Sequence, residues 1–401
     1  MRHRTLIITN DFPPRQGGIE TFVREMATRF PADGVVVYTS RTPGGPDYDR
    51  TLPFPVDRAD TSVLLPTPQA VRRAQALIAR YDCDSVWFGS SVPLGLMAAT
   101  LRSTTGASRF VATTHGHELW WAGLPGTRQV LRRVARSCDA ITYIADYMVD
   151  RLAPAVGPGA NWVKMSPAVE ASVFDEVAAE GPGGPLARQA RRRWGLGEGP
   201  VVVCAGRLVK RKGQDVVLQA WRRVLARYPE ARLLIVGKGP QAASLRELAA
   251  SLGLGRTVRF TGGLPWESMR LAYAAGSVFV GPSRNRYHGL QVEGLGIVYL
   301  EAAACGLPVV VGADGGAPET VRQAETGFVV DPTSPRDVGA AIVALLSDPA
   351  MAARMGRAGR AWVREAWGWG ERYRTLATLL GRGDELSDAG TSDGGASGSA
   401  A

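Results

Sequence analysis

The chain has little of what would anchor a protein in a membrane or crosslink it. No run approaches the roughly 18 apolar residues that a membrane span needs, and the apolar run in the N-terminus MRHRTLIITND is too short for a secretory signal. Only 4 cysteines occur in 401 residues, and they are widely scattered at Cys83, Cys138, Cys204 and Cys305. Such spacing is typical of small buried residues in a reducing compartment and argues against a disulfide framework or a metal site. We therefore expect a cytoplasmic protein.

Acidic residues are fewer than basic ones. The chain has 47 Lys and Arg against 37 Asp and Glu, a formal net charge of +10. This balance favours an anionic partner, which is a nucleotide, a nucleic acid or an acidic membrane. The length of 401 residues is sufficient for two domains, each with its own core.

Short β-branched or aromatic runs alternate with helical segments along most of the chain. This alternation predicts an α/β protein with parallel sheets of the doubly wound type. In the first half, the predicted strands lie within residues 5–10, 35–40, 85–90, 109–115 and 140–145. In the second half, they lie within residues 201–206, 231–237, 257–262, 277–283, 309–312 and 327–331.

The most informative stretch runs from Glu293 to Glu319. A carboxylate and a glycine pair precede an apolar segment, 297–304, that predicts a helix. Glycine lets backbone approach a ligand closely, and a helix start such as that at Gly296 offers unpaired N–H groups to a phosphate. Glu293 lies before this anion site and Glu301 about one turn beyond it. The two carboxylates could bracket a diphosphate and accept sugar and ribose hydroxyls, so the stretch predicts a nucleotide-sugar site.

A second motif follows the predicted strand 201–206. Arg207, Lys210, Arg211 and Lys212 come directly after it, at the carboxyl end of the strand. Arginine can bind a diphosphate with two parallel hydrogen bonds and lysine adds a point charge, which together stabilise a departing nucleoside diphosphate. We therefore expect a phosphate-binding role here.

A third motif, NDFPPRQGGIE, follows the first predicted strand. Gly17 and Gly18 would place backbone against a phosphate or sugar, as loops at this position do in doubly wound folds. The pair is not a G-x-G-x-x-G fingerprint and no acidic residue follows at the required distance, which argues against a nicotinamide cofactor.

A fourth motif, THGHE, follows the predicted strand 109–115 and holds two of only 4 histidines. Open α/β sheets bind ligands at the carboxyl ends of their strands. We expect His115 to contact a substrate, and His117 and Glu118 to brace the loop or to meet an acceptor.

These motifs together resemble the retaining glycosyltransferases of family GT4, which have the GT-B fold. The resemblance rests on Glu293-x7-Glu301, on GLPVV and GGAPE after it, and on GRLVKRKGQD and the two N-terminal motifs. It covers roughly residues 5 to 380. Within the family, THGHELWW and VEGLGIVYLEA most resemble actinobacterial mannosyltransferases that act on phosphatidylinositol mannosides.

The resemblance implies two Rossmann-like domains facing across a cleft. The acceptor-side domain would span 1–172 and be joined by a closing helix at about 360–380, and the donor-side domain would span 173–359. The tail 381–401 is rich in Gly, Ser, Ala and Asp, and its composition predicts disorder.

The resemblance also implies the reaction. Mannose would move from GDP-mannose to a phosphatidylinositol mannoside at the inner face of the plasma membrane, with retention of configuration and without a metal or other cofactor. His115, Arg207, Lys212 and Glu293 would serve catalysis. The donor would be bound by Gly17, Gly18, Arg207, Lys212, Leu264, Glu293, Gly296, Ile297, Val298 and Glu301, with Leu264 holding the base through its main chain.

Other interpretations remain open at this point. A family member that uses a UDP-sugar and another lipid, a polysaccharide or a small-molecule acceptor would share every donor-side motif. No nucleic-acid-binding motif accompanies the positive charge. Two basic amphipathic segments, 64–81 and 126–139, are either solvated helix faces or surfaces that dock on an anionic membrane through arginines and neighbouring Leu and Trp residues.

Overall fold

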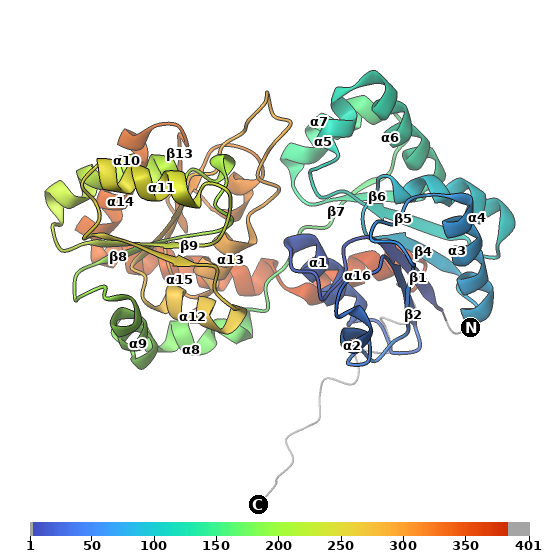
Figure 1. The fold of residues 1–401 in the computed structure, drawn as a ribbon, viewed down its shortest axis with the longest axis horizontal. Helices are drawn as coiled ribbons and strands as arrows, with labels where there is room; N and C mark the ends of the chain where they lie inside the picture. Colours follow the sequence, from blue (N-terminus) through green and yellow to red (C-terminus); the bar gives the residue numbers. More distant parts are fainter. Residues whose placement is uncertain (1–2, 384–401) are drawn as a thin grey trace, which may run out of the picture. The chain divides into compact units, whose positions relative to one another are not determined.

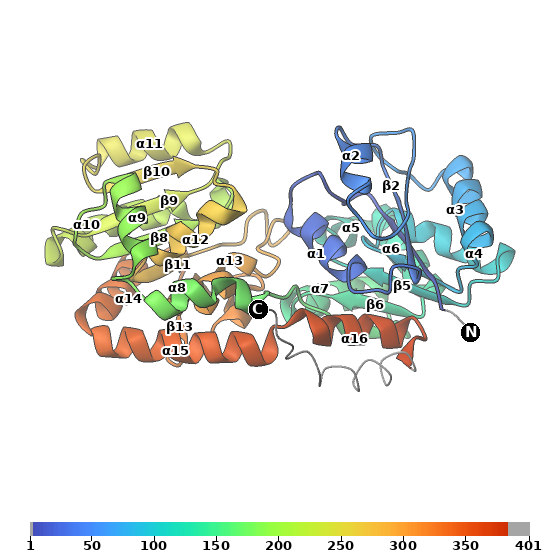
Figure 2. The same ribbon diagram turned by 90° about the horizontal axis from the view of Figure 1, so that it is seen from below.

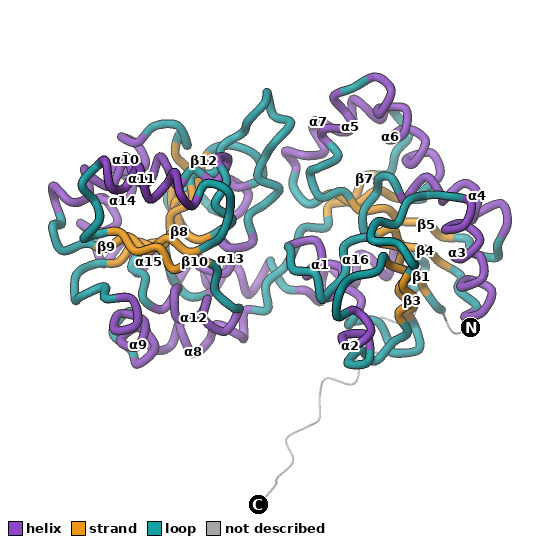
Figure 3. Tube along the Cα trace, in the orientation of Figure 1, coloured by secondary structure: helices purple, strands orange, loops and turns teal. Residues whose placement is uncertain are grey.

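The computed structural model describes residues 3–383, which form two compact α/β units. Unit 1 comprises 3–166 and 369–383, and unit 2 comprises 167–368. In each unit, helices cover a central sheet (Figures 1 and 3). The sequence analysis places the first boundary at residue 172 and the return at about 360, whereas the two units divide after Ser166 and after Gly368.

Unit 1 is built on a seven-stranded parallel sheet of order β3-β2-β1-β4-β5-β6-β7. Its strands are β1 Thr5–Thr9, β2 Val35–Thr39, β3 Val56–Arg58, β4 Ser85–Phe88, β5 Arg109–Thr113, β6 Ala140–Tyr143 and β7 Trp162–Lys164. The order reverses between β1 and β4, which defines the topological switch point of a doubly wound sheet.

Five of these strands were predicted from the sequence, and β3 and β7 were not. Both are three-residue edge strands whose residues are only partly buried or exposed. They lack the continuous apolar run that marks a strand buried on both faces. Their sequence signal is correspondingly weak.

Unit 2 repeats the architecture with a six-stranded parallel sheet of order β10-β9-β8-β11-β12-β13. Its strands are β8 Val201–Ala205, β9 Arg232–Val236, β10 Val258–Gly262, β11 Val278–Gly281, β12 Val309–Gly312 and β13 Gly327–Val330. All six were predicted from the sequence. The switch point lies between β8 and β11.

Helices connect the strands in both units. Those of unit 1 are α1 Gly18–Ala27, α2 Gly45–Asp49, α3 Pro68–Tyr81, η1 Leu94–Met97, α4 Ala98–Thr104, α5 Leu119–Gly123, α6 Pro125–Ser137, α7 Asp146–Val156 and α16 Trp369–Leu379. Those of unit 2 are η2 Ala171–Phe174, α8 Asp175–Glu180, α9 Pro185–Trp194, η3 Lys210–Lys212, α10 Gln214–Arg227, α11 Ala242–Ser251, α12 Trp266–Ala274, α13 Ile297–Ala304, η4 Ala317–Thr320, α14 Pro335–Ser347 and α15 Pro349–Ala366.

Local sequence explains where several helices begin. α3, α14 and α15 each start with proline, whose missing N–H costs nothing at the first helical position. The residues before them, Thr67, Ser334 and Asp348, each accept a hydrogen bond from a backbone N–H of the first turn. Such caps satisfy donors that the helix itself leaves unpaired.

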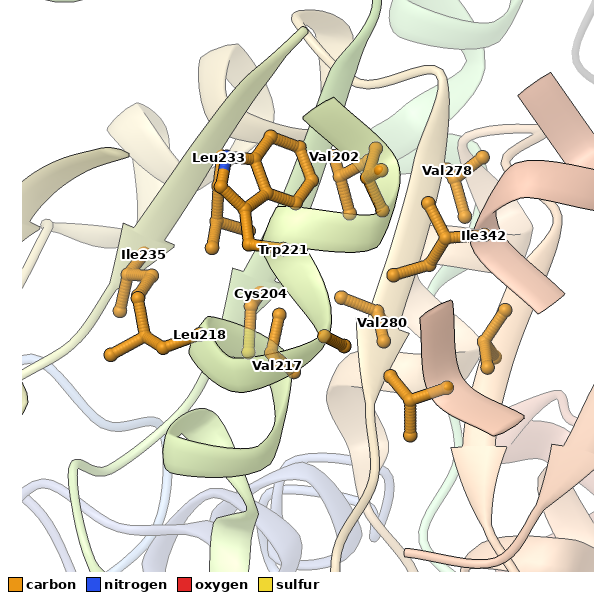
Figure 4. Close-up of a cluster of buried hydrophobic side chains, with 14 of the residues drawn as sticks. Val202, Cys204, Val217, Leu218, Trp221, Leu233, Ile235, Val278, Val280 and Ile342 are labelled. Atoms are coloured by element: carbon orange, nitrogen blue, oxygen red, sulfur yellow. The ribbon is translucent and has the colours of Figure 1, made fainter. Parts of the chain in front are cut away.

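The core of unit 2 lies between its sheet and the helices α10 and α14. Trp221 on α10 is fully buried, and Val202, Leu233 and Ile342 belong to the same apolar cluster (Figure 4). The Trp221 indole N–H donates to the hydroxyl of Thr257 at 3.2 Å, so burial leaves no polar atom of this ring unpaired. This rigid layer supports β8 and β11 from one face.

The C-terminal segment returns to unit 1. α16 packs on α1 (Figure 2). Arg382, placed in the tail by the sequence analysis, is 1% exposed, and its guanidinium donates to the carbonyl of Gly34 at 2.8 Å and covers the ring of Phe30. Burial of this arginine extends the ordered part of unit 1 beyond Leu380. Residues 384–401, the rest of the predicted tail, lie outside the described residues.

Within residues 3–383, no single helix is long and apolar enough to cross a membrane. One pair of segments, Pro335–Ser347 and Pro349–Leu379, meets the length and composition test only when taken together, with a bend of 101° between them.

Candidate active site

Loops from both sides of the unit 2 switch point meet around one carboxylate, that of Glu293. The loop after β8 contributes Arg211 and Lys212, and the loop after β11 contributes Ser283 and Glu293 itself. Parallel strands bring these loops to the carboxyl edge of the sheet, where doubly wound folds bind ligands. Residues 82 positions apart in sequence are thereby placed in contact.

Glu293 is only 7% exposed, and three groups contact its Oε2 atom. The Lys212 ammonium lies at 2.5 Å and the Arg211 guanidinium at 3.1 Å. The Ser283 hydroxyl donates to the same oxygen at 3.2 Å, and it lies 2.6 Å from the hydroxyl of the buried Tyr299. Two cations therefore surround one buried anion and leave an excess of positive charge at the edge of the sheet.

The charge state of Glu293 follows from these contacts. Burial alone would raise the pKa of this carboxyl, but the charges of Lys212 and Arg211 outweigh burial and hold its pKa below the usual value. Glu293 is consequently ionised at neutral pH. An ionised carboxylate accepts hydrogen bonds from hydroxyl groups such as those of a sugar.

Arg207 and Lys212 were both expected to bind the donor phosphates. The structure brings only Lys212 into the cluster around Glu293. The Arg207 side chain is exposed, and within residues 3–383 it has no ion-pair partner; its carbonyl accepts from the Gln214 amide at 3.3 Å. Arg211 is the second cation that contacts Glu293. It lies in the predicted basic motif but was not assigned to the site. No sequence pattern distinguishes these neighbours in the run KRK, because the backbone turn of η3 decides which side chain points inward.

The helix after Glu293 begins as predicted. α13 spans Ile297–Ala304, and Gly296 before it has a φ of 91° in the left-handed region that glycine adopts without strain. A Cβ at Gly296 would lie 2.1 Å from the Tyr299 ring. The first N–H groups of such a helix have no partner within it, so Ile297 and Val298 present donors of the kind that bind phosphate.

The GGAPE loop holds the backbone of Glu293. Gly316 donates to the Glu293 carbonyl at 2.9 Å, and a Cβ at Gly315 would lie 2.6 Å from the same carbonyl oxygen. Gly315 also has a φ of 66°. The close approach explains why glycine stands at this position, and it links the second half of the motif to the carboxylate in the first half.

Glu301 lies one turn into α13, where Tyr273 of α12 donates a hydrogen bond to it at 2.6 Å. Burial raises the pKa of this carboxyl to about 7, and the hydrogen bond from Tyr273 offsets only part of the increase. The two carboxylates of the predicted site therefore differ in character: Glu293 stays ionised, whereas Glu301 titrates near neutrality.

Leu264, expected to flank a base, lies in the turn after β10 and is partly buried. Gly262 before it has a φ of 73°, and its carbonyl accepts from the Gly237 N–H at 2.8 Å. This bond ties the turn after β10 to the turn after β9. No hydrogen bond within the described residues uses the Leu264 main chain, which is available to a ligand.

In unit 1, the THGHE loop is organised by a carboxylate at its end. Glu118 is fully buried and accepts from the backbone N–H groups of His115 at 2.9 Å and Gly116 at 2.8 Å. Ser91 donates to its other oxygen at 3.3 Å, and His117 lies 3.4 Å from it. The sequence analysis expected Glu118 to brace the loop or meet an acceptor, and these contacts are those of a brace.

His115 is held by a carbonyl at the end of β4. Its Nε2 atom donates to Gly89 O at 2.7 Å, and its ring packs edge-on against Phe22 at 5.5 Å between centroids. Burial lowers the pKa of this imidazole below its ordinary value. The neutral tautomer with hydrogen on Nε2 leaves Nδ1 as an acceptor.

Gly17 and Gly18 lie where α1 begins, directly after the loop that follows β1. Gly17 is extended, and its carbonyl accepts from the Thr21 N–H at 3.1 Å. Beside it, Glu20 is 6% exposed and pairs with Arg15 at 3.2 Å; burial raises the pKa of Glu20. No role was predicted for Glu20, although its buried carboxylate holds Arg15 of this loop.

Asp82, Cys83 and Asp84 form an acidic triplet directly before β4, and both of its aspartates have local contacts. Asp82 ends α3 with a φ of 52°, and Asp84 contacts His3 at 2.5 Å and accepts from the Arg4 N–H. The four cysteines are all free, and Cys83, Cys204 and Cys305 are buried as expected.

The structure has two doubly wound units, and in the second the charged cluster around Glu293 lies at the switch point, where such folds bind ligands. Comparison with known proteins gives the class of enzyme. The family models for glycosyl transferases group 1 and glycosyltransferase family 4 match residues 187–362 and 16–169.

Relatives match over almost the entire chain. A GDP-mannose-dependent α-(1-6)-phosphatidylinositol monomannoside mannosyltransferase from Mycolicibacterium smegmatis is 43% identical, covering 94% of this chain and 97% of that protein. A GDP-mannose-dependent monoacylated α-(1-6)-phosphatidylinositol monomannoside mannosyltransferase from Corynebacterium glutamicum is 41% identical, covering 93% of this chain and 97% of that protein. The chain belongs to glycosyltransferase family 4 and is a glycosyltransferase.

Solved structures agree on the fold. Sucrose-phosphate synthase from Thermosynechococcus elongatus superposes with a TM-score of 0.75 at 22% identity, covering 96% of this chain and 100% of that one. The chain has the GT-B class of fold, which confirms the fold class expected from the sequence.

Proposed function

We propose that this enzyme transfers mannose from GDP-mannose to a phosphatidylinositol mannoside. The observation that carries the proposal is the identity of 43% over 94% of the chain to a relative with that named activity. The site in unit 2 has charges that suit such a donor: cations for the pyrophosphate, and an ionised carboxylate that accepts hydrogen bonds from sugar hydroxyls.

In this proposal, the donor diphosphate lies beside Lys212 and the start of α13. The Lys212 ammonium and the N–H groups of Ile297 and Val298 stabilise negative charge that grows as the bond from the sugar to phosphate breaks. Arg207, exposed on the loop after β8, adds a guanidinium to the same diphosphate. Arg211 keeps Glu293 ionised when Lys212 turns to the ligand.

The two carboxylates contact the two ends of the donor. Glu293 accepts hydrogen bonds from hydroxyl groups of the transferred sugar, and Glu301 accepts hydrogen bonds from the ribose hydroxyls. Leu264 holds the base through its main chain. In unit 1, Gly17 and Gly18 contact the donor. The Nδ1 atom of His115 accepts a hydrogen bond from a hydroxyl of the transferred sugar.

We propose a reaction that retains configuration without a covalent enzyme intermediate. The bond between the anomeric carbon and the β-phosphate oxygen breaks, and the acceptor hydroxyl oxygen bonds to the same face of that carbon. The hydroxyl proton passes to the departing phosphate oxygen, and GDP and the elongated glycolipid leave. No enzyme carboxylate acts as a nucleophile in this scheme, so Glu293 remains a hydrogen-bond acceptor.

Purified enzyme offered three donors in the presence of EDTA tests the proposal. GDP-mannose, UDP-glucose and UDP-N-acetylglucosamine are each supplied with and without a mannosylated phosphatidylinositol extract. We expect mannose transfer only from GDP-mannose and only when lipid is present. NMR of the product should show an α-linked mannose. Turnover of a UDP-sugar while GDP-mannose is inert would replace the donor assignment, and a β product would exclude retention.

Because the proposed acceptor is a lipid, we also propose that the enzyme works at the inner face of the plasma membrane. Peripheral contact with anionic lipid is consistent with the net charge of +10. Flotation of the full chain with vesicles of phosphatidylcholine and phosphatidylinositol, compared with vesicles of phosphatidylcholine alone, tests this part of the proposal.

A further inference from the structure

The loop between β11 and Glu293 contains a hairpin that has no role in the reaction described above. It spans residues 284–291, and Arg286 and Gln291 pair in it as an antiparallel bridge. Their backbone N–H groups donate to each other's carbonyls at 2.9 and 3.1 Å. Gly289 donates to the Arg286 carbonyl and Leu290 to the Tyr287 carbonyl, both at 3.1 Å. Backbone hydrogen bonds therefore define the shape of the tip.

The base of the 284–291 hairpin is fixed to two neighbouring loops. The Arg284 guanidinium pairs with Asp215 at 2.7 Å, and the Arg284 N–H donates to the Arg211 carbonyl at 2.7 Å. The Asn285 N–H donates to the Asp314 carboxylate at 2.8 Å. These bonds hold the hairpin against the loops after β8 and β12, at the edge of the sheet where doubly wound folds bind ligands.

Two consecutive residues at the tip, Tyr287 and His288, have left-handed backbone conformations with φ of 51° and 54°. Within residues 3–383, only two other non-glycine residues, Asp82 and Ala324, have a positive φ. The conformation is strained for a bulky residue, and such residues gather at ligand-binding sites. A glycine would form the same turn without strain. The backbone of the turn therefore does not explain an aromatic ring at this tip.

The Tyr287 ring is presented to solvent. It is 56% exposed, and it is the one large apolar side chain that is exposed among the unit 2 side chains whose burial is described. The Arg286 guanidinium lies over the ring, 4.8 Å from its centroid, and orients it. A ring that is already oriented loses little conformational freedom when a ligand covers its exposed surface.

The position of the hairpin narrows the class of ligand. Gln291 is two residues before Glu293, at most about 7 Å along the chain, and the tip lies farther along the same hairpin. Glu293 is proposed to bind the transferred sugar, and the group that adjoins this sugar during the reaction is the acceptor. A sugar or inositol ring has hydroxyl edges and an apolar C–H face that an aromatic ring can cover. The anionic diphosphate has no such face.

We propose that the 284–291 hairpin is an acceptor-binding element, in which Tyr287 stacks on the C–H face of a sugar or inositol ring of the acceptor. Tyr287 is then a specificity-determining residue that contacts the acceptor and takes no part in bond breaking. It sets the affinity for the acceptor and leaves the affinity for the donor unchanged. This inference rests on the proposed transfer to a phosphatidylinositol mannoside.

Steady-state kinetics of Tyr287→Gly in the full chain test the hairpin. The acceptor is the deacylated, water-soluble headgroup of phosphatidylinositol monomannoside. Its KM should rise about tenfold, the loss expected for one aromatic contact, while the KM for GDP-mannose stays at the wild-type value. Tyr287→Phe keeps the ring and should restore the acceptor KM.

Two comparisons keep binding separate from folding. Glycine removes the ring but also relieves the positive φ of residue 287, so Tyr287→Gly should be at least as stable as wild type in thermal melting. Ala324→Gly is the matched control, because Ala324 is exposed, has a φ of 61° and lies before β13, outside the proposed site. This control should keep both KM values.

Saturation-transfer NMR with the same headgroup detects the contact without turnover. Irradiation of the aromatic protons of the enzyme should saturate ring C–H protons of the headgroup in wild type and in Tyr287→Phe, and far less in Tyr287→Gly. The mannose and inositol signals show which ring lies on Tyr287. If wild type binds the headgroup in this way but transfers no mannose, the proposed function is wrong and the hairpin assignment stands.

Four results would overturn the hairpin assignment. The first is a wild-type acceptor KM in Tyr287→Gly. The second is a raised KM for GDP-mannose with the acceptor KM unchanged, which would place the ring at the donor. The third is an equal loss in Tyr287→Gly and Ala324→Gly, which would assign the effect to the stability of unit 2. The fourth is the absence of saturation transfer to the headgroup in wild type, whatever the donor.

Discussion

The Lys212 ammonium lies 2.5 Å from the Glu293 carboxylate, at the carboxyl edge of the second sheet. The two residues come from loops after β8 and β11, the strands that flank the switch point. Both side chains are largely buried. A buried ion pair of this kind is weak evidence for stability but ready to exchange one partner for a ligand charge.

Replacement of Lys212 tests its role on the diphosphate. We expect Lys212→Ala to lower kcat by a factor on the order of 10²–10³, as loss of a preorganised donor to a leaving group does. Steady-state kinetics with GDP-mannose gives the number. Lys210→Ala is the matched control, because Lys210 is exposed two positions earlier in the same turn and should retain activity. Near-wild-type turnover by Lys212→Ala would remove this residue from the phosphate site.

The titration of Glu301 predicts a pH dependence of donor binding. The pKa of this carboxyl is raised to about 7, so it is largely protonated at pH 6 and ionised at pH 8. Ribose hydroxyls donate hydrogen bonds more strongly to the ionised form of Glu301 than to the protonated form. The affinity for the donor should therefore weaken about tenfold from pH 8 to pH 6. Calorimetric titration of GDP-mannose across this range measures the slope.

Glu301→Gln is the companion to that titration. The amide keeps the shape and an acceptor oxygen but cannot ionise. Its donor affinity should be weaker than that of wild type at pH 8 and show no rise between pH 6 and pH 8. A slope retained in the variant would assign the titration to another group.

The brace on the His115 loop predicts a difference between two substitutions at Glu118. Glu118→Ala leaves the backbone N–H groups of His115 and Gly116 buried without acceptors, at about 1–3 kcal/mol each. Glu118→Gln keeps an acceptor oxygen for both. We expect the alanine variant to lose stability in urea titration and to lose kcat/KM, and the glutamine variant to recover most of both. Equal loss in the two variants would indicate that the charge of Glu118 matters more than its hydrogen bonds.

The close approach of Gly315 to Glu293 predicts the effect of a single methyl group. A side chain at a φ of 66° costs about 1–2 kcal/mol, and a Cβ here would also meet the Glu293 carbonyl oxygen at 2.6 Å. Gly315→Ala should therefore lower both the melting temperature and kcat/KM, since it displaces the carboxylate.

Gly253→Ala is the matched control for that substitution. Gly253 has a φ of 73° but open space around its Cβ position, so the variant carries the backbone strain alone. It should lose some stability and keep its activity. If Gly315→Ala behaves in the same way, the contact with Glu293 is not important to the site.

Several elements were predictable because their signals are local. The apolar segment 297–304 became α13 with the same bounds, since glycine before it and after it sets both ends. All six strands of unit 2 were predicted for a similar reason. The four inner strands β8, β9, β11 and β12 are buried apolar runs, and the partly buried edge strands β10 and β13 are still four or five residues long and contain valine and phenylalanine. The three-residue edge strands β3 and β7 lack such runs and were missed.

Other features depend on contacts between distant parts of the chain, and no local pattern contains them. Arg211 pairs with Glu293, a contact that no sequence pattern predicted, because the turn of η3 directs its side chain to a loop 82 residues away. Tyr273 donates a hydrogen bond to Glu301, which lies 28 positions later in the sequence. Burial of the Glu301 carboxyl raises its pKa to about 7.

The sequence by itself determined the two doubly wound units, the family and the chemical types of the site residues, because periodicity, glycine placement and motif spacing are properties of short segments. Only the tertiary structure decided which charges neutralise one another and which remain. The pairing of Lys212 with Glu293 and the loop held by Glu118 both follow from strand order and helix packing. Electrostatic interaction depends on distance and burial, and those are set when the chain folds.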